Sequence, residues 1–167
     1  MDFLSRKRPD VSFCDFFFNC PVLEPQLDIQ VPPDAESYIE GKVREYDVIV
    51  VTQSCDLEKG KIETVLVCPV ISIDKFDQSK DNKEKIRRGF MPGYHMLNSC
   101  ALDGFTSPIK IVSIRQVFGL PFDYIQNMAS HSRPRLRLLP PYREHLAQAF
   151  ARFIMRIGLP NDIPPIK

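Results

Sequence analysis

Short apolar runs separated by polar, proline-containing turns recur along the chain, a pattern typical of a mainly β protein. The two clearest runs, residues 46–52 and 62–73, are rich in Val and Ile and predict buried strands. Weaker runs predict strands at residues 94–97 and 109–121. Residues 135–138 alternate basic and apolar side chains, as a half-exposed strand does. The pattern therefore predicts a mainly β (α+β) fold of short, mostly antiparallel strands.

The C-terminal part contains the clearest helix, which follows Pro140-Pro141 and ends near Gly158. One face is apolar and consists of Leu146, Phe150, Phe153, Ile154 and Ile157. The opposite face is polar and consists of His145, Gln148, Arg152 and Arg156. The apolar face predicts packing against a core, with a dimer or partner interface as the alternative. Residues 122–128 predict one or two further helical turns. The charged residues 74–90 predict an exposed loop or short helix, either a solvated face or a flap over a site.

The first part of the chain is predicted to be irregular because several prolines interrupt it. We therefore expect residues 1–41 to form an irregular N-terminal extension, and residues 42–167 to form the rest of a single globular domain. A cluster of four phenylalanines within the extension either forms a strand or covers a core: Phe13, Phe16, Phe17 and Phe18.

Composition narrows the class of protein. Hydrophobic residues make up 44% and charged residues 26% of the 167 residues, as is usual for a soluble globular domain. No apolar run approaches the ~20 residues needed to span a bilayer, and the N-terminus lacks the apolar stretch of a signal peptide. We therefore expect a cytoplasmic protein without membrane contact. The cysteines are odd in number and lack disulfide spacing, which predicts free thiols.

Charge is distributed unevenly between the two halves. Residues 1–82 contain 9 basic and 16 acidic side chains, whereas residues 83–167 contain 13 and 5. The second half either presents a basic face to an anionic partner or pairs with the acidic first half. Arg133, Arg135 and Arg137 form a comb of basic residues, and Arg88 lies in the predicted flap. These four arginines are the candidate nucleic-acid-binding residues, because contact with a phosphate backbone needs such a stripe.

A polar loop between the two clearest strands holds the candidate chemistry. Gln53, Ser54, Cys55 and Asp56 place an amide, a hydroxyl, a thiol and a carboxylate directly after a strand. Amide and carboxylate side chains can read base edges. The alternative is that Ser and Asp only satisfy the backbone of the turn.

Cys55 has three interpretations. It is a structural thiol, a nucleophile that needs a nearby histidine base, or a zinc ligand together with Cys68, His95 and Cys100. The spacing of those four residues matches no compact zinc pattern, so we predict neither a metal site nor a cofactor.

Three segments resemble the MazF/PemK-like toxin family, whose members are small SH3-like β-barrels. Residues 47–53 are similar to the family's opening strand and following loop, and residues 65–70 are similar to a second strand. Residues 109–120 are similar to the strand that precedes a short helix, and residues 137–157 lie where the family has its terminal helix. The resemblance covers about residues 42–158.

The resemblance implies a metal-independent endoribonuclease of a toxin–antitoxin or phage-defence system in bacteria. It implies RNA as the substrate, an antitoxin or larger defence subunit as a protein partner, and a homodimer. Within it, the candidate catalytic residues are Gln53, Ser54, Cys55, Asp56 and Arg115.

The chain departs from the family at one place. Family nucleases carry an Arg-Pro pair after the first loop, where this chain has Lys59-Gly60-Lys61. The departure favours an alternative, in which a catalytically inactive barrel serves as a protein-binding regulatory or adaptor subunit of such a system.

Overall fold

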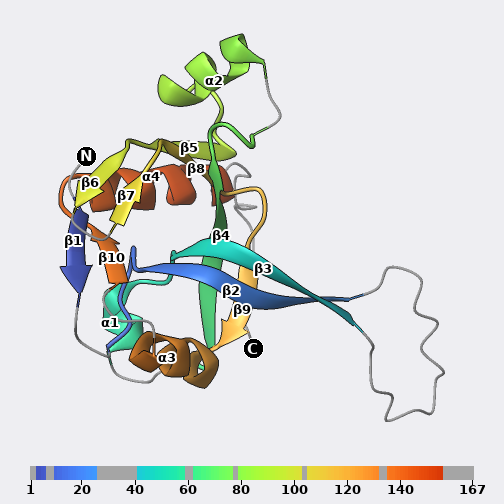
Figure 1. Ribbon diagram of the computed structural model, residues 1–167, viewed down its shortest axis with the longest axis vertical. Helices are drawn as coiled ribbons and strands as arrows, with labels where there is room; N and C mark the ends of the chain where they lie inside the picture. The colour runs from blue at the N-terminus through green and yellow to red at the C-terminus, as the bar shows by residue number, and fades with distance from the viewer. Residues whose placement is uncertain are drawn as a thin grey trace, which may run out of the picture.

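The computed structural model describes residues 3–6, 10–25, 41–58, 62–76, 79–102, 105–131 and 135–155. They form a mainly β protein with an antiparallel sheet and a C-terminal helix, as the sequence predicts (Figure 1). The elements in chain order are β1 (Phe3–Arg6), β2 (Phe16–Pro25), β3 (Gly41–Val50), α1 (Ser54–Leu57), β4 (Thr64–Ser72), α2 (Lys80–Arg87), β5 (Tyr94–Leu97), β6 (Cys100–Leu102), β7 (Phe105–Ser107), β8 (Lys110–Ser113), β9 (Phe118–Pro121), α3 (Phe122–His131), β10 (Arg135–Leu138) and α4 (Tyr142–Ile154).

Strand β4 is the central strand of the sheet. Its first half pairs with β9, its middle with β3 and its second half with β8, so that Val67 is paired on both sides. The strand order is β2-β3-β4-β8-β5, with β9 attached to β4. Within the described residues β2 and β5 remain edges of this sheet, and no closed barrel is found.

Residues 109–121 form two strands, where the sequence predicted one. The chain turns at Arg115 and Gln116, so β8 and β9 pair with different halves of β4. The polar loop also differs from expectation, because residues 54–57 form the short helix α1. Part of the charged segment forms α2, and the Ser79 hydroxyl caps it by accepting the Asn82 N–H.

Both faces of the central strands are buried, which explains their continuous apolar sequence. Ile49 and Cys68 face the cluster that contains Leu146 of α4. Val48 and Val67 face the cluster that contains Ile125 of α3. Because side chains alternate along a strand, the two helices cover opposite faces of the sheet.

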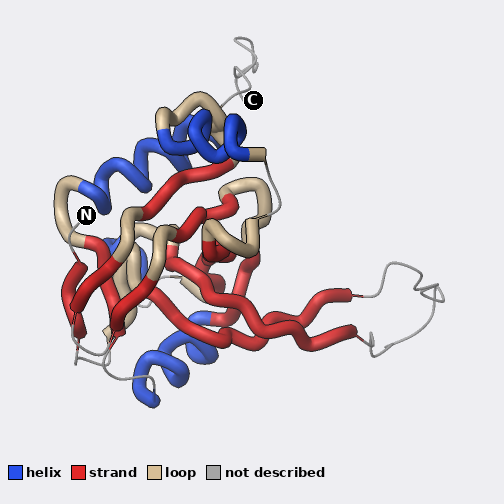
Figure 2. Tube along the Cα trace, turned by 45° about the horizontal axis from the view of Figure 1, so that its top comes forward, coloured by secondary structure: helices blue, strands red, loops and turns tan. Residues whose placement is uncertain are grey.

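The N-terminal segment is not irregular where the structure describes it. Strand β2 pairs with β3 over most of its length, and β1 pairs with β10. Phe13, Phe16 and Phe17 are buried in the two clusters. Pro21 and Pro25 are tolerated because β2 is an edge strand of its sheet, whereas residues 26–40, with Pro32 and Pro33, lie outside the described residues. The paired outer ends of β2 and β3, residues 22–25 and 41–44, extend from the body as an arm (Figures 1 and 2).

Candidate functional site

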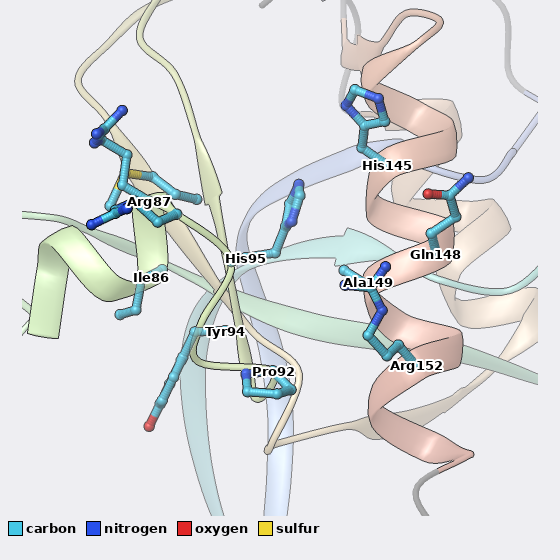
Figure 3. A pocket seen from close by; sticks show the side chains of 12 residues that line it. Ile86, Arg87, Pro92, Tyr94, His95, His145, Gln148, Ala149 and Arg152 are labelled. Atoms are coloured by element: carbon cyan, nitrogen blue, oxygen red, sulfur yellow. The ribbon is translucent and has the colours of Figure 1, made fainter.

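A cleft of about 300 Å³ separates α4 from the segment that contains α2 and β5 (Figure 3). The polar side chains in its wall come from both sides and are nearly all basic, imidazole or amide groups: Arg87, Arg88, His95, His145, Gln148 and Arg152. The lining contains neither Asp nor Glu. A cleft with this lining attracts anions.

Helix α4 provides one wall because its two faces differ. Leu146 is fully buried, and Phe150 and Phe153 pack against the same core cluster. The residues at the complementary positions, His145, Gln148 and Arg152, therefore line the cleft. This is the polar face that the spacing of the sequence predicts.

Strand β5 provides the other wall through His95. Leu97, two residues further along, packs in the same core cluster as α4, whereas Tyr94 and Met96 pack in a separate cluster with Ile86. Because side chains alternate along a strand, His95 lies on the same side as Leu97 and faces α4. Figure 3 shows its ring between the two walls.

His95 is kept neutral by its surroundings. Burial, with a further contribution from the charge of His145, lowers its pKa from 6.5 to about 4. Its Nε2 atom is buried and has no hydrogen-bond partner among the described residues. A buried polar atom without a partner is uncommon, so this nitrogen has an unused hydrogen-bonding capacity at the cleft.

The arginines of the cleft differ in how far they are neutralised. Arg87 donates two hydrogen bonds to Glu84, at 2.7 and 2.6 Å. Arg88 and Arg152 form no ion pair with another described residue, and the guanidinium carbon of Arg88 lies 5.1 Å from the centre of the Phe90 ring. The hydrogen bonds from Arg87, and to a lesser extent the charge of Arg88, lower the pKa of Glu84, so this one carboxylate offsets part of the charge of the three arginines and the cleft keeps a net positive charge.

The candidate catalytic loop lies elsewhere. The Ser54 hydroxyl is hydrogen-bonded to the Ser12 hydroxyl at 2.9 Å and accepts the Phe13 N–H at 3.2 Å. These bonds fix the N-terminal segment to the loop, and neither of them is made to the backbone of the turn itself. Gln53 precedes α1 and makes no side-chain capping bond. Cys55 is exposed, and its thiol contacts Asp56 Oδ1 at 3.7 Å.

Arg115 is not brought together with that loop. The loop's buried residue, Leu57, packs in the α3 cluster. Arg115 lies beside Gly93 and shares a cavity with Phe153 of α4. The grouping of Gln53, Ser54, Cys55, Asp56 and Arg115 into one catalytic site therefore has no support in the geometry.

Two of the candidate nucleic-acid-binding arginines are ion-paired inside the protein. Arg135 and Arg137 have side chains only 1% and 11% exposed, and both contact the fully buried Asp15. Arg135 also donates to the carbonyl oxygens of Ala129 and Asp10. These arginines pair with the acidic first half of the chain, the alternative to an exposed basic face. Arg133 lies outside the described residues, and Arg88 lines the cleft.

Sequence reasoning missed His95 as a partner of His145. The two residues are far apart in the chain, and only the pairing of β5 with β8 brings His95 opposite α4. In the sequence, the one indication of a shared site was that both histidines lie in the basic half of the chain, residues 83–167.

No group of three or more potential metal ligands occurs in the described part of the chain. None of the helices described is both long and apolar enough to cross a bilayer. The chain matches no model of a known protein family, and a comparison with curated proteins finds no match either.

Proposed function

We propose that the cleft between α4 and the α2–β5 segment binds the phosphate groups of RNA, and that the protein acts on nucleic acid. The observation that supports this is the convergence of Arg88, Arg152 and the imidazoles of His95 and His145 in a cleft whose lining has no carboxylate.

Each group suits a phosphate ligand. Guanidinium groups donate paired hydrogen bonds to phosphate oxygens. The Nε2 atom of His95 gains a hydrogen bond that the protein itself does not provide. The Gln148 amide adds a neutral donor next to Arg152. A phosphate therefore finds charge and hydrogen-bond donors from both walls.

In its finer form the proposal is metal-independent RNA cleavage by a divergent MazF/PemK-like protein. His145, exposed in the wall, accepts the proton of the 2′-hydroxyl, whose oxygen attacks phosphorus; the bond from phosphorus to the 5′-oxygen breaks, and the 5′-oxygen leaves as a hydroxyl by taking a proton from water. Arg88 and Arg152 stabilise the charge of the pentacoordinate phosphate. His95 is a poor base because its pKa is lowered to about 4, and its neutral ring donates a hydrogen bond in the tautomer that carries the proton on Nε2.

The test is the affinity of the purified protein for a labelled single-stranded RNA, measured at several salt concentrations. Arg88→Ala and Arg152→Ala should each weaken binding on the order of tenfold and reduce the salt slope by about one. Arg44→Ala is the matched control, because Arg44 is an exposed arginine paired with Glu24 on the arm. Binding that is equally strong in both cleft variants would contradict the proposal.

Cleavage is tested separately with the same RNA. His145→Ala should abolish formation of a 2′,3′-cyclic phosphate end while RNA binding persists. Intact RNA after prolonged incubation with wild-type protein would remove the nuclease form and leave the binding form.

A second candidate, a protein-binding subunit, is favoured by the arm. Leu23 of β2 and Val43 of β3 are direct cross-strand partners, and they are 62% and 66% exposed. Exposed apolar pairs of this kind are a common feature of protein contacts. A stoichiometric protein partner that is lost in Leu23→Ser and Val43→Ser, with no RNA bound, would support this candidate over the first.

A further inference from the structure

A second cavity, of about 320 Å³, lies next to the phosphate cleft. The two share Pro92 and Tyr94 as lining residues. The second cavity has a different character, because three of its lining residues are aromatic: Phe90, Tyr94 and Phe153. Its charged lining residue is Arg115.

We propose that this second cavity binds a nucleobase, so that the site takes single-stranded RNA with one base unstacked beside the bound phosphate. The inference rests on the proposed function and specifies its substrate. A base in a duplex is stacked on both faces and cannot enter, whereas bases of single strands stack readily on aromatic side chains.

Phe90 is the principal stacking residue. Its side chain is 65% exposed, so its ring is accessible to a ligand in the cavity. Arg88, which lines the phosphate cleft, lies over the same ring at 5.1 Å. Arg88 thus connects the two cavities, and together they suit a ligand that carries a negative charge next to a planar group.

The remaining walls are held in place by packing. Tyr94 packs edge-to-face against the buried Phe76, with ring centres 5.1 Å apart. Arg115 lies over Gly93 so closely that a Cβ atom there would be 2.6 Å from its Cγ. Gly93 thereby lets Arg115 lie along the cavity wall, where its guanidinium can donate to the edge of a stacked base.

The experiment compares three ligands of equal length: a single-stranded RNA, the same strand with abasic positions, and the corresponding duplex. Wild-type protein should bind the single strand on the order of tenfold more tightly than the abasic strand or the duplex. Phe90→Ala should remove this preference and leave the affinity for the abasic strand unchanged. Arg152→Ala should weaken the binding of all three ligands.

The outcomes separate the two proposals. If Phe90→Ala binds the single strand as wild type does, the base subsite is wrong while the phosphate cleft stands. If it weakens the abasic strand equally, Phe90 only positions Arg88, and the subsite is again wrong. If wild-type protein binds none of the ligands, the proposed function itself fails.

A direct reporter is available because the chain contains no tryptophan. Phe90→Trp introduces a single indole at the cavity, and its exposed position makes the substitution structurally mild. Single-stranded RNA should quench its fluorescence, whereas the abasic strand should not. Equal quenching by both strands would contradict stacking at this position.

Discussion

Two groups of arginines in the basic half of the chain have opposite surroundings. Arg135 and Arg137 lie inside the protein and share one carboxylate, Asp15. Arg88 and Arg152 line a cleft without carboxylates and have no ion pair among the described residues. The comparison shows that a stripe of arginines in a sequence indicates neither exposure nor ligand binding. The location of the nearest carboxylate separates a structural arginine from a binding arginine.

The largest effect is expected from removing the shared carboxylate. Asp15→Asn leaves two shielded guanidinium groups without a counter-charge, and we expect it to lower the free energy of unfolding by about 3–5 kcal/mol. Urea denaturation measures this. Asp81→Asn, which removes the exposed partner of Lys85, is the control and should cost less than about 1 kcal/mol. Equal, small effects would mean that Asp15 is not a structural centre.

The next effect concerns pH and the cleft histidine. Because the pKa of His95 is lowered from 6.5 to about 4 in the folded protein, the unfolded chain takes up a proton first as pH falls. The free energy of unfolding is therefore not reduced by this histidine above pH 6.5, and it falls between pH 6.5 and 4 by up to about 1.4 kcal/mol per pH unit. His95→Gln should flatten this part of the profile, measured by urea denaturation at several pH values.

A smaller effect is expected from reversing a cleft charge. Arg152→Glu should weaken RNA binding by at least about tenfold without changing the free energy of unfolding by more than about 0.5 kcal/mol. Filter binding and urea denaturation on the same preparation measure both quantities. A large loss of stability would show that Arg152 belongs with the structural arginines.

The smallest effect is expected from removing Glu84, which forms an ion pair with the cleft residue Arg87. Glu84→Ala frees Arg87 and removes a negative charge near the cleft, so RNA affinity should rise on the order of twofold at low salt. The gain should disappear at high salt because the groups are exposed. A decrease in affinity would show that Arg87 needs its partner to be held in place.

The sequence predicted those features that depend on local periodicity. The apolar run of β4 and the division of α4 into a core face and a polar face follow from burial along one element. The exception is Ile154, which was predicted on the apolar face and is 56% exposed. The role of Arg135 did not follow, because its alternating pattern also fits an exposed strand. Its partner Asp15 lies 120 residues earlier, in a segment that its prolines marked as irregular.

The candidate site was predicted only in part, for a related reason. The polar face of α4 is visible in the spacing of His145, Gln148 and Arg152. The opposing position of His95 depends on strand pairing, which the local sequence does not encode. The residue types of the polar loop at residues 53–56 predicted a catalytic site. In the structure, the Ser54 hydroxyl forms hydrogen bonds with Ser12 and Phe13 of the N-terminal segment.

The strand order also has a consequence for amide hydrogen exchange. The amides at the centre of β4 lie between two neighbouring strands, so we expect them to be among the slowest to exchange. The proposed site instead includes β5, which is an edge strand at one end of the strand order. That edge can open to solvent while the centre stays protected, so a ligand that joins α4 to β5 should slow exchange mainly at the periphery.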